Sequence, residues 1–214
     1  MARFLCGERK LEKYAKKKVN YIKFMQEYLQ LGHMQLVTEN SGKYYLPHQP
    51  VIRETSLTTK LRVVFDASAK TTNGKSLNDI MSTGPKLQKD IYDIILKWRL
   101  WKYVVTADVE KMYRQIKVAE KDQGYQHILW RENRKEAIKE YKLTTVTYGT
   151  ASAPFLAVRA LFYIADNCPN KNIQDIIKED FYMDDPLTRA DTIPECKTIQ
   201  QEVSSQLATY GFNL

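Results

Sequence analysis

The stretch "DFYMDDPLT", residues 180–188, places two adjacent carboxylates, Asp184 and Asp185, directly after an aromatic and apolar triplet. Like charges in apolar surroundings cost free energy unless something neutralises them. Most Asp-Asp pairs are simple turn formers that bond local backbone or water, and this pair alone fits that interpretation. A second acid, Asp108, also ends an apolar run, "YVVTAD". Carboxylates at the tips of buried strands suit Mg²⁺, which requires oxygen ligands, so we expect a strand, a tight turn and a strand beside a cation site.

Composition narrows the class of protein. The chain of 214 residues is long enough for one domain or two closely joined subdomains, and its 43% hydrophobic and 27% charged residues exclude global disorder. The net charge of +8 favours a polyanionic partner such as nucleic acid. Its three cysteines are widely spaced and indicate reduced intracellular thiols.

No membrane span or export signal is expected. No apolar run reaches the ~18 residues that a spanning helix needs. The N-terminal "MARFLCGERK" becomes charged too early for a secretory signal. We therefore expect an intracellular chain without a targeting signal and without a membrane partner.

Hydrophobic spacing predicts several helices. One long amphipathic helix is expected over residues 8–32, ending at Gly32, and residues 1–20 carry seven Lys or Arg against two Glu. This basic face is either solvated or in contact with phosphates. The remaining predicted helices cover residues 89–101, 152–168 and 194–212.

Short β-rich runs lie between these helices, with a strong turn signal at Asn73-Gly74. Strands and helices alternate without a regular βαβ order, which indicates an α+β fold or a split α/β sandwich. The predicted strands cover residues 60–68, 102–109, 125–130 and 140–149.

Other segments could complete a nucleotide site. Lys60 and Arg62 lie on a predicted strand, Gly149 opens a run of small residues before a helix, and Tyr113 follows Asp108 by five residues. Each has an ordinary alternative: an exposed strand cation, a plain strand-to-helix turn and a core aromatic.

Taken together, the order of these motifs resembles that of reverse transcriptases. The motifs are "RVVFD", "ADV" with its tyrosine, "YGTASAP" and "YMDD". Longer strings, among them "KLRVVFDASAKT", "KYVVTADVEKMYRQI" and "DFYMDDPLTRADT", are similar to the BEL/Pao class of LTR retrotransposons. The resemblance covers nearly all of residues 3–214.

The resemblance implies the catalytic residues of an RNA-directed DNA polymerase. Asp108 and Asp184 would coordinate two Mg²⁺ ions, for which Mn²⁺ could substitute, with help from the backbone carbonyl of Val109. Asp185 would lie beside the metals. A primer 3′-hydroxyl would then attack the α-phosphate of a dNTP and release pyrophosphate.

It also implies binding residues. Arg62, with Arg53 as its partner, would hold the incoming triphosphate. Tyr113 would exclude the ribose 2′-hydroxyl. Tyr148 and Gly149 would lie under the nascent base pair. The implied nucleic-acid contacts are Lys60, Tyr182 and Met183.

The implied architecture is the fingers and palm of a right-hand polymerase, with an antiparallel palm sheet backed by helices. A basic helix and lead-in would occupy residues 1–45, and fingers and palm residues 46–214, ending before the thumb. The implied fingers are about residues 46–103 and 119–145, and the implied palm about 104–118 and 146–214.

The implied partners are an RNA or DNA template–primer, dNTPs and the rest of a retroelement polyprotein: thumb, RNase H, protease and integrase. The implied location is a cytoplasmic retroelement particle. One departure stands out, because Pro186 occupies a position where the BEL/Pao pattern has an apolar residue such as Leu. Proline lacks an N–H and fixes φ, so it could shift the hairpin. A decayed, non-catalytic copy is therefore the alternative, and a basic RNA-binding module unrelated to polymerases is a third.

Overall fold

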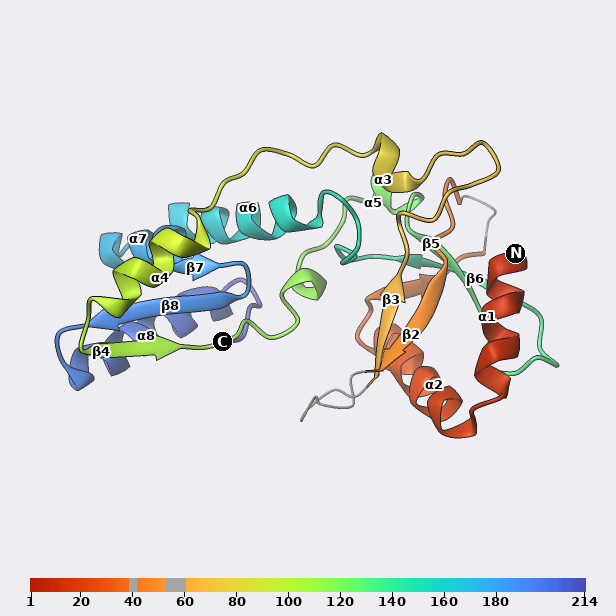
Figure 1. The fold of residues 1–214 in the computed structure, drawn as a ribbon, viewed down its shortest axis with the longest axis horizontal. Helices are drawn as coiled ribbons and strands as arrows, with labels where there is room; N and C mark the ends of the chain where they lie inside the picture. The colour runs from red at the N-terminus through yellow and green to blue at the C-terminus, as the bar shows by residue number, and fades with distance from the viewer. Residues whose placement is uncertain (39–41, 53–60) are drawn as a thin grey trace. The chain divides into compact units, whose positions relative to one another are not determined.

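The computed structural model describes residues 1–38, 42–52 and 61–214 (Figure 1). The chain divides into two compact units, each with its own apolar core. The first unit contains Met1–Ser82 and Lys117–Ala153, and the second contains Thr83–Ile116 and Pro154–Leu214. The α+β class is confirmed, because both units combine helices with antiparallel sheets.

The first unit begins with two helices, α1 (Ala2–Glu12) and α2 (Ala15–Gln30). The prediction of one helix over residues 8–32 is wrong, because Tyr14 has non-helical dihedrals, φ −133° and ψ 83°. The break lets α1 pack against β2 (His48–Ile52) while α2 packs against β1 (Met34–Leu36) and β3 (Leu61–Phe65). The apolar positions of one straight helix could not cover both surfaces.

The end of α2 is as predicted. Gly32 has a positive φ of 71°, and the His33 N–H donates to the Tyr28 carbonyl at 2.9 Å. The Gly32 N–H donates to Leu29 at 3.1 Å. These two bonds form a Schellman cap, which requires a residue that tolerates the left-handed conformation.

Two antiparallel sheets complete the first unit. In β3 the side chains of Leu61, Val63 and Phe65 are buried whereas Arg62 is exposed, the alternation of a half-buried strand. β6 ends at Leu143, earlier than predicted. The Thr144 N–H donates to the His33 carbonyl and the Thr144 hydroxyl donates to the Gly32 carbonyl, both just after α2. One sheet has three strands in the order β1-β6-β5: β1 (Met34–Leu36), β6 (Lys139–Leu143) and β5 (His127–Trp130). The other pairs β2 with β3 (Leu61–Phe65). Two short helices, α3 (Leu77–Ile80) and α5 (Glu120–Gln123), lie outside these sheets.

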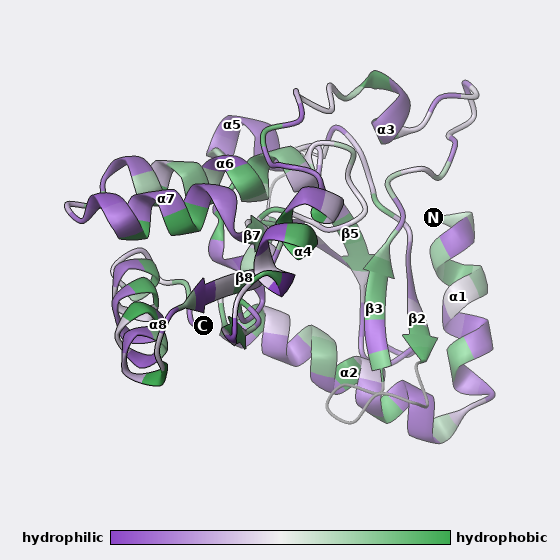
Figure 2. Cartoon of the chain, turned by 60° about the vertical axis from the view of Figure 1, so that its left-hand side comes forward, coloured by the Kyte–Doolittle hydropathy of each residue, from purple (hydrophilic) through white to green (hydrophobic). Residues whose placement is uncertain are grey.

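Aromatic side chains from α2, β3 and β5 fill the core of this unit around His48. The His48 Nε2–H donates to the Leu129 carbonyl at 2.9 Å, and Nδ1 accepts from the Tyr21 hydroxyl. Burial lowers the pKa of His48, so a neutral ring satisfies both bonds. In Figure 2, α2 alternates between hydrophobic and hydrophilic residues, as expected of a helix with one buried face.

The second unit is built on an antiparallel sheet of β4 (Tyr103–Thr106), β8 (Asp185–Ala190) and β7 (Phe181–Tyr182), in the order β4-β8-β7. Alternation along β8 places Pro186 and Thr188 on one face and Asp185, Leu187 and Arg189 on the other. The sheet is accompanied by α4 (Ile91–Arg99), η1 (Met112–Gln115), α6 (Ala153–Asp166), α7 (Lys171–Glu179) and α8 (Ile193–Ala208).

These helices partly match the sequence predictions. α4, α6 and α8 lie where spacing predicts them, whereas α7 is missed. Within the second unit, α4 packs against β7 and β8. Residues 146–153 group with the first unit. Within the described part of the chain, no helix has the length and apolarity needed to cross a membrane.

Candidate active site

The site is centred on a hairpin between β7 and β8. Tyr182 pairs with Asp185, which leaves Met183 and Asp184 as a two-residue turn. Met183 has a positive φ of 56° and Asp184 does not, the pattern of a type II′ turn that normally takes glycine first. Holding a side chain in this conformation costs about 1–2 kcal/mol. The turn interrupts the strand alternation that would point Asp184 and Asp185 to opposite faces.

The segment that follows β4 is hydrogen-bonded to this turn through the backbone. The Val109 N–H donates to the Asp184 carbonyl at 2.8 Å, so Asp108 is next to a residue in contact with the turn. The chain then bends sharply at Lys111, whose φ is 51°, and enters η1, which carries Tyr113. Val109 is buried in the core of the second unit, which anchors the segment.

Electrostatic effects show that the acidic side chains share one region. Burial raises the pKa of Asp185, and the charges of Asp184 and Asp108 raise it further. The pKa of Tyr113 is also raised, first by burial and then by the charge of Asp184. The structure therefore brings Asp108, Asp184, Asp185 and Tyr113 together.

These carboxylates have the donor chemistry of a hard-cation site. Among the residues that the structure describes, no three acidic, histidine or cysteine side chains form a complete metal-binding cluster. Mg²⁺ seldom uses an all-protein cage, because it keeps several waters and completes its shell with substrate phosphates. A bound cation would neutralise the negative charge that helps to raise the pKa of Asp185. These carboxylates therefore fit Mg²⁺.

A second set of predicted residues lies in the first unit. The Tyr148 hydroxyl donates to the Val63 carbonyl of β3. Gly149 has a φ of 98°, and a Cβ there would lie 2.7 Å from the Phe65 carbonyl oxygen. This position therefore requires glycine. Tyr148 and Gly149 thus lie against β3, the strand that exposes Arg62, whereas Arg53 and Lys60 lie outside the described residues.

Residues 51–214 match the family described as reverse transcriptase (RNA-dependent DNA polymerase). The chain belongs to this family. No curated protein matches the sequence.

Solved reverse transcriptases share the fold. The native protease–reverse transcriptase of prototype foamy virus has a TM-score of 0.65 at 16% identity, over 88% of this chain and 22% of that one. The foamy viral protease–reverse transcriptase dRH in complex with double-stranded DNA has a TM-score of 0.62 at 19% identity, over 87% of this chain and 28% of that one. This chain thus spans about a quarter of the length of those structures.

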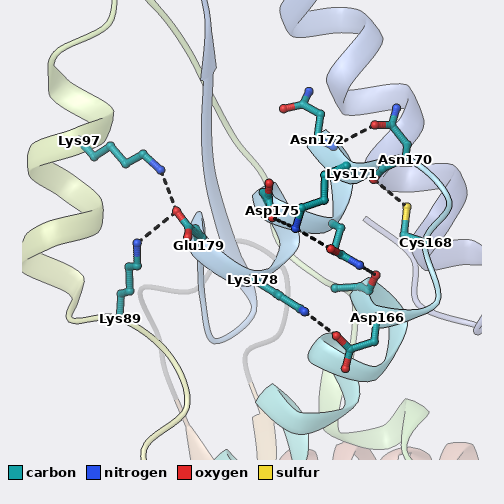
Figure 3. A network of polar contacts seen from close by, with 12 residues as sticks. Lys89, Lys97, Asp166, Cys168, Asn170, Lys171, Asn172, Asp175, Lys178 and Glu179 are labelled. Atoms are coloured by element: carbon teal, nitrogen blue, oxygen red, sulfur yellow. Dashed lines mark hydrogen bonds and ion pairs between the residues drawn. The ribbon is translucent and has the colours of Figure 1, made fainter.

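Sequence reasoning missed the ion pairs that support the reverse transcriptase hairpin. Asp180 is only 2% exposed, and its carboxylate contacts Arg189 Nη1 at 2.6 Å and Lys97 Nζ at 3.3 Å. The adjacent Glu179 contacts Lys89 at 3.1 Å and Lys97 at 3.3 Å (Figure 3). The sequence contains Asp180 directly before "FYMDD", but no local pattern predicts that Arg189 and Lys97 are its partners.

It also missed Asn78, which holds the segment after Tyr148. The Asn78 amide nitrogen donates to the Gly149 carbonyl at 2.9 Å, and its amide oxygen accepts from the Ala151 N–H at 2.8 Å. One side chain thus satisfies two backbone groups of a loop. An asparagine in "SLND" is too common a capping pattern to indicate this role.

The reverse transcriptase hairpin forms with Pro186 in place. Pro186 pairs opposite Phe181, and the Leu187 N–H donates to the Asp180 carbonyl at 2.7 Å. Alternation of hydrogen bonds along an antiparallel strand then turns the Pro186 nitrogen away from β7, so this pairing does not need the missing N–H. The Pro186 ring is buried. The pairing of β7 with β8 therefore forms without a Pro186 N–H.

Proposed function

We propose that the chain is a polymerase segment of a reverse transcriptase from a BEL/Pao-class LTR retrotransposon. It would add dNTPs to a primer 3′-hydroxyl on an RNA or DNA template, using two Mg²⁺ ions. The observation that carries the proposal is the grouping of Asp108, Asp184 and Asp185 beside a turn tied to Val109. The BEL/Pao assignment rests on the long sequence strings and is the finer part of the proposal.

In this proposal the residues have separate roles. Asp108 and Asp184, with the Val109 carbonyl, would hold the cations, and Asp185 would tune the local charge. Bound Mg²⁺ lowers the pKa of an attacking hydroxyl and offsets charge on the phosphoryl oxygens. Tyr113 is within electrostatic reach of Asp184, and its ring would exclude a ribose 2′-hydroxyl.

The first unit would supply the binding surface. Arg62, exposed on β3, would contact the triphosphate, with Arg53 and Lys60 as further cations. Tyr148 and Gly149 would support the nascent base pair. Tyr182 and Met183 would contact the primer end, and the net charge of +8 suits a template–primer. The remaining proposed partners are the other domains of a retroelement polyprotein, in a cytoplasmic particle.

Primer extension on poly(rA)–oligo(dT) with Mg²⁺ tests the proposal. We expect Asp184→Asn to reduce extension on the order of a hundredfold or more, because it removes a charged cation ligand. Asp175→Asn is the matched control, since Asp175 is an exposed acid of the same unit paired with Lys171, and it should retain activity.

Extension that survives Asp184→Asn would contradict the cation assignment. A folded wild-type chain that extends no primer, while Pro186→Leu does, would instead identify a decayed copy. The buried, well-paired Pro186 favours the active copy.

A further inference from the structure

The amide of Met183 has a partner from outside the hairpin. In a two-residue hairpin the strand pairing uses Tyr182 and Asp185, so the N–H of the first turn residue has no acceptor within the turn. The Met183 N–H instead donates to Gln88 Oε1 at 3.2 Å. Gln88 is 95 positions away in sequence, and both residues are half-buried. Leaving such a donor unpaired would cost free energy.

The turn is thus held on both sides. The Gln88 side chain binds the peptide before Met183, and the Val109 N–H binds the carbonyl of Asp184 at 2.8 Å. The strained φ of Met183 lies between these two bonds. A non-glycine residue persists in this conformation when the surroundings determine it, as two hydrogen bonds from outside the hairpin do here.

Gln88 is itself held in place by its neighbours. Lys89, the next residue, pairs with Glu179 at 3.1 Å (Figure 3), and Glu179 ends the helix that leads into β7. α4 begins at Ile91 and packs against β7 and β8. The Gln88 side chain therefore starts from a backbone that is anchored to the same hairpin it contacts.

We propose that Gln88 is a positioning residue of the polymerase site. By accepting the Met183 N–H, it holds the turn in the conformation that directs Asp184 and Asp185 toward the cation position. This inference rests on the proposed function. In this role Gln88 would touch neither cation nor substrate and would act through the backbone of the turn.

Amide exchange of Met183 tests the contact without any need for activity. In protein labelled with ¹⁵N-methionine, Gln88→Leu should make the Met183 amide exchange about fivefold faster or more, the effect of losing one hydrogen bond. Gln88→Glu keeps the acceptor and should retain protection. Gln206→Leu is the matched control, because it removes a half-buried glutamine whose Nε2 donates to the Ile164 carbonyl at 3.1 Å in the same unit.

Mn²⁺ titration then tests the positioning role. Gln88→Leu should weaken Mn²⁺ binding about threefold to tenfold and lower kcat of primer extension with little change in KM for dNTP, whereas Gln206→Leu should change neither.

Unchanged Met183 exchange in Gln88→Leu would overturn the inference, as would altered exchange with unchanged Mn²⁺ affinity and kcat. Absence of Mn²⁺ binding by the wild-type chain would contradict the proposed function and remove the positioning role with it. Binding that Gln88→Leu leaves unchanged would contradict the positioning role alone.

Discussion

The two units hold their candidate site residues by different kinds of contact. In the first unit, Tyr148 and Gly149 are held by uncharged groups: a hydroxyl, an amide side chain and a close backbone approach. In the second, an ion pair between the buried Asp180 and the half-buried Arg189 supports a hairpin that carries further carboxylates. Close packing and uncharged hydrogen bonds therefore hold the site residues of the first unit, whereas charge pairing holds those of the second. Three substitutions test this difference.

The largest effect is expected at Asp180. Asp180→Asn would leave Arg189, whose side chain is 15% exposed, without its charged partner, and should lower the free energy of unfolding by about 3 kcal/mol. Glu179→Gln is the control, because that side chain is 42% exposed and should change stability by less than about 1 kcal/mol. Urea denaturation measures both. Equal, small losses would show that the second unit does not depend on buried charge.

A smaller effect is expected at Gly149. Gly149→Ala places a Cβ 2.7 Å from the Phe65 carbonyl at a φ of 98°, and should destabilise the chain by about 2 kcal/mol. At Gly74, φ is 77°, but an added Cβ would have no atom of the described residues within 4 Å, so Gly74→Ala should cost only about 1 kcal/mol. Thermal or urea unfolding distinguishes the two. If both variants lose the same stability, the close approach to β3 contributes nothing.

The smallest effect, and the one of opposite sign, is expected at Asp185. Its raised pKa means that the folded state holds the proton more tightly, so stability falls as pH rises from about 4 to the raised pKa and stays lower above it. Asp185 is exposed, so water screens the repulsion, and Asp185→Asn should stabilise the chain at neutral pH by no more than roughly 1 kcal/mol and lose this advantage below about pH 4. Asp191→Asn, at an exposed aspartate just past β8, serves as control. A stabilisation that persists in acid would not come from charge repulsion.

Local patterns in the sequence were sufficient for much of the second unit. α4 and α8 follow from apolar spacing, and the stop after α8 follows from Gly211, whose φ is 81°. α7 could also have been predicted, because Ile173, Ile176 and Ile177 have helical spacing after a capping Asn170.

Other features depend on contacts between distant segments. The break at Tyr14 follows from packing on β2, and the grouping of α4 with β7 and β8 joins segments more than 80 positions apart. Hydrophobic spacing describes one segment at a time, so it predicts that a face is apolar without showing what covers it.

The sequence by itself determined the family, the turn at "YMDD" and the identity of the acidic residues, because residue types and short intervals are local properties. The tertiary structure decided that the buried Asp180 pairs with the half-buried Arg189, that Pro186 is accommodated and that Gln88 reaches the Met183 amide. These contacts depend on how strands and helices pack, since each joins groups whose proximity arises only after the chain has folded.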